Sequence, residues 1–360
     1  MRCKLLCSSS AQHLSQIYAG FGLLSHQGVI HLEFVKDANY RSGTLAPPFL
    51  SVLIDDIYRV IYDTADSADI DPQQLQQCDV YFKRSYDPIK LSTMEEKHKV
   101  YPLGFNYPVY ADKDYTYMRN LWNFIADRSF LKSNFVRQFI RTSTLCSRLL
   151  HPTNGRYDCH VSALEGLPIL SDEPVIMFFA RLWDPKRAKK SELQDERHCI
   201  NRMRVECIRK LRAEFGAMFT GGLEPDEFTQ KNFPDCIVSN PKIARKHIYL
   251  RNLKQASICV ATMGLQQSNG WKLAEYIAGA KAIVSEKLYH SVPGNFEAGM
   301  NYLEFETPDQ CVSCVQELVN NPVKRFSMMK RNLDYYHTYL RPDILILNTL
   351  LILSTLITDN

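Results

Sequence analysis

The stretch SICVATMGLQQSNGWKLAEYIAGAKAIVSE, residues 257–286, contains an apolar run, a helical pattern and a second apolar run in that order. The runs at 257–264 and 282–286 are typical of short buried strands. The pattern between them carries one acid, Glu275, for which a solvated position on a surface helix is the ordinary expectation. A strand, a helix and a strand predict parallel strands with the helix packed on the sheet.

The same alternation continues on both sides of this stretch. PVIMFFARLWDP, residues 174–185, predicts a strand running into a turn, and a long helical pattern extends from Ser191 to Phe215. Downstream of 286, the segment PDQCVSCVQELVNN predicts an amphipathic helix. The remaining expected elements are the segments AMFTGG (217–222) and DCIVSN (235–240) and a helix at 244–255.

The first half of the chain begins with a strand, a helix and a strand over residues 2–35. Four further short runs rich in β-branched or aromatic residues predict strands, and together they favour a largely parallel sheet. These are SVLID (51–55), RVIYD (59–63), DVYFKR (79–84) and KVYPLGF (99–105). Long helical patterns with basic faces occupy 111–150, and 151–160 is typical of a loop.

A chain of 360 residues exceeds the usual size of one domain. We therefore expect two α/β units, at 1–165 and 166–335, and a terminal helical segment at 336–360. The composition is ordinary for a globular protein, and 43 basic against 39 acidic residues argue against a nucleic-acid binder. The apolar run at the N-terminus is too short for a signal peptide, so we expect a cytoplasmic protein.

The eleven cysteines are scattered, which favours reduced and mostly buried thiols over a disulfide scaffold. The pair Cys311 and Cys314 has no second pair nearby, so we interpret both as core residues of a helix and not as zinc ligands. The apolar run from Ile344 to Ile357 spans 14 residues, whereas a membrane span needs roughly 20. It predicts a helix docked on the rest of the protein, with shallow membrane association as the alternative.

Polar residues follow several expected strands at the edge where α/β proteins bind ligands. Arg181, Lys186 and Arg187 follow the strand at 174–180, two glycines end the strand at 217–222, and residues 266–270 precede the helix of the opening stretch. Arginine can clamp two phosphate oxygens, lysine adds a point charge, and glycine lets the backbone approach a ligand. This combination suits a diphosphate.

The order of these segments resembles the donor domain of GT-B glycosyltransferases over about residues 173–320. FFARLWDPKR resembles the strand and loop in which an arginine and a lysine six positions later hold the donor diphosphate, and Arg181 and Arg187 have that spacing. LAEYIAGAKAIVSE resembles the helix and strand whose glutamate holds the donor ribose, which places Glu275 on that glutamate. SVPGNFEAGMNYLEF is similar to the end of this domain in glycosyltransferases of the spore-maturation protein type.

The resemblance implies an α/β fold of the GT-B class: two Rossmann-like domains face a cleft, and a C-terminal helix packs back on the first domain. It implies an acceptor-side domain at 1–165 and a nucleotide-sugar donor domain at 166–335. It also implies transfer of a sugar from a nucleotide diphosphate donor to the hydroxyl of a glycan, lipid or protein, with neither a metal nor a cofactor. Arg181, Arg187 and Glu275 would be catalytic. The implied donor-binding residues are Lys186, Gly222, Ser268, Asn269, Gly270 and Lys272.

Two positions depart from the family pattern. Members of the E-x7-E kind carry an upstream acid that contacts the transferred sugar, whereas this chain has Ser268 there. The second basic residue of the diphosphate site is Arg187 in place of lysine, and the adjacent Lys186 could share its role. Asn269 and Gly270 could equally form a plain helix cap and turn, and Lys272 a solvated first-turn residue.

In the first half, Lys83, Arg84 and Tyr86 end an expected strand that faces the cleft, so they are candidates for acceptor or phosphate contacts. A solvated basic turn explains them equally well. His13 begins the first helix, where some GT-B enzymes keep a catalytic histidine, although capping or packing is the ordinary role. Asp55, Asp56 and Asp63 follow or end strands, so one of them could act as a base. Asp69 to Asp71 and Asp112 to Asp114 match a D-x-D pattern. Chance also produces both kinds of placement.

Two other functions fit parts of the pattern. A nucleotide-sugar epimerase of the same fold would use the same donor site without an acceptor. A non-catalytic nucleotide- or nucleic-acid-binding protein would use basic helices such as 134–150, against which the near-neutral charge argues.

Overall fold

The computed structural model describes residues 1–7, 12–36, 48–111, 159–238 and 246–358. The helical patterns expected at 111–150, the acidic pattern at 112–114 and most of the loop at 151–160 lie outside these residues.

The first sheet has six strands in the order β2-β1-β3-β4-β5-β6. The pairs β1–β2, β4–β5 and β5–β6 are parallel, whereas β3 runs antiparallel to both β1 and β4. The strands are Arg2–Cys7 (β1), His31–Lys36 (β2), Phe49–Ile54 (β3), Tyr58–Asp63 (β4), Val80–Lys83 (β5) and Val100–Pro102 (β6).

The antiparallel β3 corrects our prediction for two acidic candidates. A tight turn joins β3 to β4, and its residues Asp55 and Asp56 have the left-handed φ angles of 51° and 64° that short polar side chains tolerate. Because β3 is reversed, this turn lies beside Arg2 at the start of β1, where Asp55 Oδ1 accepts the Arg2 amide at 2.6 Å. Both aspartates are therefore at the opposite edge of the sheet from the carboxyl ends of β1 and β4.

The second sheet has five parallel strands in the order β11-β10-β9-β7-β8. Numbered along the chain this is the order 2-1-3-4-5 of a doubly wound sheet, whose direction of winding switches between β7 and β9. The strands are Ile176–Ala180 (β7), Phe219–Leu223 (β8), Ile258–Ala261 (β9), Ala282–Glu286 (β10) and Leu303–Phe305 (β11). The predicted α/β class with two Rossmann-like parts is confirmed.

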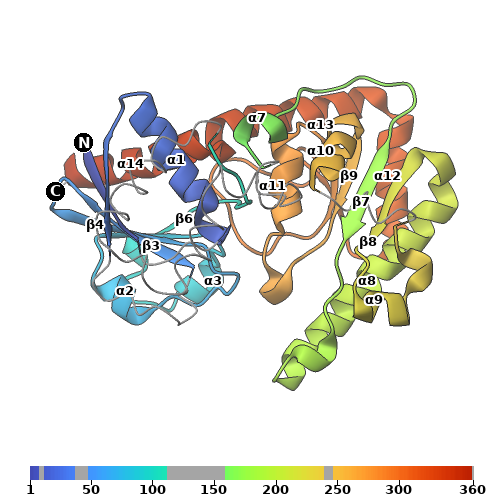
Figure 1. The fold of residues 1–360 in the computed structure, drawn as a ribbon, viewed down its shortest axis with the longest axis horizontal. Helices are drawn as coiled ribbons and strands as arrows, with labels where there is room; N and C mark the ends of the chain where they lie inside the picture. Colours follow the sequence, from blue (N-terminus) through green and yellow to red (C-terminus); the bar gives the residue numbers. More distant parts are fainter. Residues whose placement is uncertain (8–11, 37–47, 112–158, 239–245, 359–360) are drawn as a thin grey trace, which may run out of the picture.

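Helices cover both faces of the second sheet (Figure 1). Successive strand residues point to opposite faces, so Phe178 packs in the cluster with α8 and α12, and Phe179 in the cluster with α10 and α11. The helices of this half are Val161–Leu164 (α7), Ser191–Phe215 (α8), Glu227–Asn232 (α9), Lys246–Gln255 (α10), Trp271–Ala278 (α11), Pro308–Asn320 (α12) and Pro322–Tyr335 (α13). The bounds predicted for α8 are confirmed.

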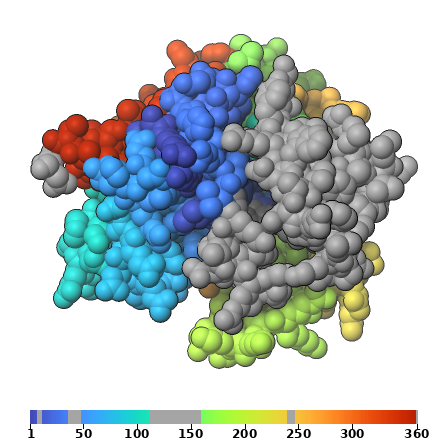
Figure 2. Space-filling view, turned by 60° about the vertical axis from the view of Figure 1, so that its left-hand side comes forward, coloured from blue at the N-terminus to red at the C-terminus, as the bar shows by residue number. Residues whose placement is uncertain are grey.

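The remaining helices are Ser15–His26 (α1), Pro72–Gln76 (α2), Pro88–Leu91 (α3) and Pro342–Thr358 (α14). A single π-helical turn, Tyr336–Leu340, joins α13 to α14. In Figure 1 these two red helices run across both halves of the molecule, and in Figure 2 the red end lies against the blue N-terminal part. The predicted return of the C-terminal helix to the first domain is confirmed.

The contact between α1 and α14 is close. Leu345, Ile346 and other apolar residues of α14 share one core with Ile17 and Phe21 of α1. Gly20 permits this approach, because a Cβ there would lie 2.2 Å from the carbonyl oxygen of Pro342. Within the described residues, no single helix is long and apolar enough to cross a membrane, although α13 with its π turn and α14 pass that test together as a pair bent by 54°.

Candidate functional site

The carboxyl ends of β7 and β9 lie at the switch point of the second sheet. The two strands pair only near their starts, through Ile176 with Ile258 and Met177 with Cys259. Beyond these pairs, the buried guanidinium of Arg204 from α8 joins the ends: it donates to the Arg181 carbonyl, to Thr262 Oγ1 at 3.0 Å and to the Met263 carbonyl at 2.7 Å. Burial lowers the pKa of Arg204 to about 10, with Glu286 opposing.

The loop that follows β9 is held in a strained conformation. Gln266 and Gln267 have φ angles of 58° and 56°, in the left-handed region that costs a residue with a side chain roughly 1–2 kcal/mol. Glu286, at the end of β10, accepts the Met263 amide at 2.8 Å, and burial raises the pKa of this carboxyl. Backbone strain of this kind concentrates at functional sites, so this loop is a candidate part of the site.

Glu275 lies on the buried face of α11, so a solvated position is wrong for it. Its two carboxylate oxygens accept from Lys246 Nζ and from the Tyr249 hydroxyl, each at 2.6 Å. Burial alone would raise the pKa of Glu275, but Lys246 and Lys272 hold it below its ordinary value. The carboxylate is therefore charged and already bonded through both oxygens before any ligand arrives.

Lys272 occupies the first turn of α11, next to the switch point. Its ammonium lies 4.2 Å from the centre of the Tyr249 ring, and no ion pair joins it to any other described residue. Burial lowers the pKa of Lys272 to about 8, opposed first by Glu275. Nearby Glu224 favours the charged form, whereas Lys246 and Arg204 disfavour it. Lys272 is half-buried, so the alternative of a solvated first-turn lysine is wrong. Glu275 acts on it without forming an ion pair, so the ammonium can still gain from a nearby anion.

The three basic residues after β7 differ in exposure and support. Arg181 is exposed, and its guanidinium carbon lies 4.8 Å from the centre of the Trp183 ring. Lys186 and Arg187 belong to the single 3-10 turn Pro185–Arg187, and both side chains extend into solvent. Among the described residues, Arg187 makes only a long contact of 3.7 Å with Asp184. Arg181 therefore has the most defined position of the three.

The other predicted donor residues have structural roles of their own. Gly222 has a φ of 145°, and a Cβ there would lie 2.7 Å from the Cys236 carbonyl oxygen, so close packing requires glycine. Ser268 is buried and its carbonyl accepts the Gly264 amide. Asn269 is buried and donates to the His290 carbonyl at 3.3 Å. Gly270 is the N-cap of α11 and brings no capping side chain.

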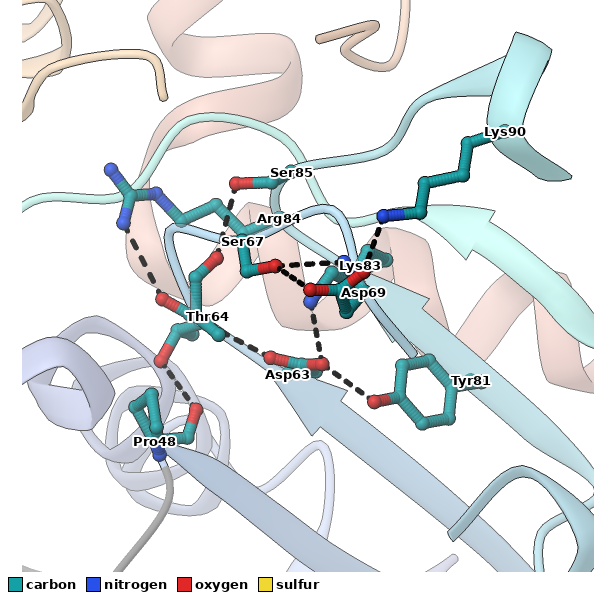
Figure 3. Close-up of polar contacts among 11 residues, drawn as sticks. Pro48, Asp63, Thr64, Ser67, Asp69, Tyr81, Lys83, Arg84, Ser85 and Lys90 are labelled. Carbon is teal, nitrogen blue, oxygen red and sulfur yellow. Dashed lines mark hydrogen bonds and ion pairs between the residues drawn. The ribbon is translucent and has the colours of Figure 1, made fainter. Parts of the chain in front are cut away.

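In the first half, polar side chains form a network at the carboxyl ends of β4 and β5 (Figure 3). Asp63 Oδ2 accepts from Lys83 Nζ at 2.7 Å and from the Tyr81 hydroxyl at 2.6 Å. Burial lowers the pKa of Lys83, while Asp63 opposes that change. Lys83 is only 1% exposed, so the alternative of a solvated basic turn is wrong and its contacts are internal.

Arg84 and its neighbours join the two halves. The buried Arg84 guanidinium pairs with Asp66 at 2.6 Å and donates to the Asn269 carbonyl at 2.7 Å. The carbonyl of Tyr86 accepts the Ser291 amide at 2.9 Å. These contacts bring the carboxyl ends of the two sheets toward each other.

His13 adds an aromatic contact between the halves. Its ring meets that of Trp271 edge-on, with 4.7 Å between the centres. Burial lowers the pKa of His13, with Asp66 opposing. Packing against Trp271 is therefore an observed role of this histidine. The acidic pattern at 69–71 is also accounted for, since Asp69 pairs with Lys90 and Asp71 caps α2.

No protein-family model matches the chain, and no curated protein matches it. Solved structures do. The C-terminal domain of a Glycosyl Transferase Group 1 family protein from Francisella tularensis is 15% identical over 49% of this chain and 96% of that domain, with a TM-score of 0.35. Anabaena HepE, solved with UDP and glucose, is 11% identical over 97% of this chain and 98% of its own, with a TM-score of 0.34. The S. aureus protein TarM is 12% identical over 52% of this chain, with a TM-score of 0.36, and the match spans only 36% of TarM.

The first of these structures is a group 1 glycosyltransferase, the class that the sequence resembles. Identity and TM-score are both low, so function has to come from the residues of this chain.

Sequence reasoning missed two residues at the switch point, Arg204 and Glu286. Glu286 ended a predicted strand and could have been noted from that position. Arg204 is one of several arginines on α8, and only its approach to two strand ends distinguishes it.

Proposed function

We propose that this protein is a glycosyltransferase that moves a sugar from a nucleotide diphosphate donor to an acceptor hydroxyl. The observation that carries the proposal is the switch point between β7 and β9, where Arg181 and Lys272 supply positive charge beside the start of α11. Helix starts and switch points are the usual places for phosphate groups in doubly wound proteins. The carboxyl ends of β4 and β5 face this site and would border the acceptor.

In this proposal, Arg181 and Lys272 stabilise the charge that builds on the leaving diphosphate, with Lys186 and Arg187 as an outer pair of cations. This is electrostatic stabilisation by groups already in place, and it requires no metal or cofactor. Glu275 would orient the donor ribose, for which it must exchange its bond to Lys246 or Tyr249. Ser268, Asn269 and Gly270 would contact the donor through the backbone before α11, and Gly222 would support the neighbouring strand.

The test is stabilisation of the protein by UDP, GDP, ADP, CMP and TDP, because a ligand at 100 times its Kd raises stability by about 2.7 kcal/mol.

Arg181→Ala should weaken binding of the preferred nucleotide by about 1.5–3 kcal/mol and lower turnover, since it removes a charge-assisted contact with phosphate. Glu275→Gln should weaken donor binding, because the amide keeps only one accepting oxygen.

Arg202→Ala is the matched control, since Arg202 is exposed on α8 and should leave binding unchanged. Each variant is compared with its own unliganded melting temperature, because Glu275→Gln also disturbs the pair with Lys246. Parent-like affinity for every nucleotide in both folded site variants would refute the proposal.

Lys272 makes a separate prediction about pH. The protonated amine attracts an anion and the neutral amine does not, so nucleotide affinity should be level between about pH 7, above the terminal phosphate pKa of about 6, and the Lys272 pKa of about 8, and should fall above it. The fall should approach tenfold per pH unit until the higher pKa of the complex is reached. Lys272→Arg should give affinity that is level from pH 7 to 9.5, because arginine stays charged. Titration calorimetry across this range measures both curves, and a parent curve without a fall above pH 8 would contradict the role.

The proposal extends to the cellular setting. A cytoplasmic location fits a nucleotide-sugar donor, and the acceptor would be a glycan, lipid or protein. Peripheral membrane contact through the C-terminal apolar segment would use the outer face of α14, where Leu351 is exposed. An epimerase would convert the sugar with donor alone, so product analysis without acceptor separates the two enzymes.

A further inference from the structure

Side chains on one face of α8 donate hydrogen bonds to most of the loop that carries Arg181. Four side chains spaced three or four residues apart, and so on one side of the helix, each donate to a carbonyl of this loop. Gln194 bonds the Ala188 carbonyl at 2.9 Å, Arg197 the Asp184 carbonyl at 2.7 Å, Asn201 the Trp183 carbonyl at 2.7 Å, and Arg204 the Arg181 carbonyl. We call this set the α8 ladder. Figure 1 shows α8 reaching well beyond the end of β7.

The ladder fixes Arg181 from two directions. Arg204 holds its carbonyl and links it to the end of β9 through the Met263 carbonyl. Asn201 holds Trp183, on whose ring the Arg181 guanidinium lies: the Asn201 amide group accepts the Trp183 amide at 2.9 Å and donates to the Trp183 carbonyl. Both the backbone of Arg181 and the surface under its side chain are therefore held by α8.

The ladder residues are buried or half-buried, whereas the cations that the loop displays are exposed. Asn201 and Arg204 are 3% and 8% exposed, so a ligand on the outer side of the loop would not contact their polar groups directly. Buried polar side chains usually have hydrogen-bond partners, and Asn201 and Arg204 each bond a carbonyl of this loop. The arrangement holds an exposed arginine in place before a ligand binds.

We propose that Asn201 and Arg204 are positioning residues for the diphosphate of the nucleotide donor, acting through Arg181. This rests on the proposed function. A preplaced guanidinium binds phosphate without first losing the freedom of a flexible side chain and loop, which strengthens binding and keeps the charge where it develops during the reaction. Neither residue touches the ligand.

The experiment is a double-mutant cycle with the nucleoside diphosphate, among UDP, GDP, ADP and TDP, that stabilises the parent most. Asn201→Ala and Arg204→Lys are each made in the parent and in Arg181→Ala, and Kd is measured by calorimetry. Each should weaken binding at least tenfold in the parent and less than twofold in Arg181→Ala. Arg202→Ala, on the exposed side of the same helix, should change neither value.

Equal weakening in both backgrounds, or none in the parent, would overturn the positioning role while leaving the glycosyltransferase proposal intact. Absence of nucleotide binding by the parent would instead reject the proposed function.

Amide hydrogen exchange of residues 181–188 then decides whether the ladder orders the loop, since Gln194→Ala and Asn201→Ala should accelerate exchange there and Arg202→Ala should not. Gln194→Ala removes one half-buried bond and so provides a folded variant if Asn201→Ala does not fold.

Discussion

Asp63→Asn should destabilise the protein by about 3–5 kcal/mol, because it removes the ion-pair partner of the buried Lys83 ammonium. Asp63 accepts three hydrogen bonds, from Lys83, from Tyr81 and from the Ala65 amide. The asparagine keeps one accepting oxygen and turns an NH2 group toward the lysine or the tyrosine. Urea unfolding followed by circular dichroism measures the change.

Asp69→Asn is the matched control in the same region (Figure 3). Asp69 also pairs with a lysine, Lys90, but its side chain is 75% exposed and that of Lys90 is 49% exposed. Exposed pairs contribute at most about 1 kcal/mol, so the two substitutions should differ by several-fold in cost. Similar costs for both would contradict the buried pair as a main support of this sheet.

Gly20→Ala should cost about 3 kcal/mol, the upper part of the range for overpacking, and should loosen α14 from α1. The added methyl would lie 2.2 Å from the Pro342 carbonyl oxygen and 2.5 Å from Cγ1 of Ile346. Backbone cannot turn aside as the tip of a flexible side chain can, so the helices must separate. The thermal midpoint and the rate of proteolysis within α14 report this change.

Leu351→Ala serves as the control for that substitution, because this side chain lies on the outer face of α14 and is 55% exposed. It should change stability by no more than about 0.5 kcal/mol. Unchanged proteolysis in Gly20→Ala would mean that α14 does not depend on this close approach.

The alternation of strands and helices in the second half was predictable, because each main segment has a clear pattern of apolar residues. The run at 176–180 is apolar throughout, as expected for a parallel strand buried on both faces, and α8 keeps a helical pattern over its full length. The short β11 and the helix α13 were missed, since three residues give little pattern and α13 is largely polar. The reversal of β3 was also missed, because turn residues such as Asp55 and Asp56 suit both a hairpin and a strand end.

The candidate site was predictable only where residues follow strands directly. Arg181 follows β7 directly, and Lys272 lies in the first turn of α11, the helix that comes after β9. Partners from other elements were not predictable. The bonds of Glu275 to Lys246 and Tyr249 join α11 to α10, and those of Arg204 depend on how α8 crosses the ends of two strands. Such contacts follow from packing between distant segments, which local patterns do not contain.

The packing of α14 on α1 affects the order in which the protein folds during its synthesis. The first sheet is complete in sequence at Pro102, yet its core also needs Leu345 and Leu353, about 240 residues later. At roughly 5–20 residues per second, the ribosome takes roughly 12–50 s to supply them. During that interval the part of the apolar surface of α1 that α14 covers in the finished fold has no such cover on the nascent chain. The last helix thus determines when the first part of the protein can finish folding, and chaperones have that interval in which to bind it.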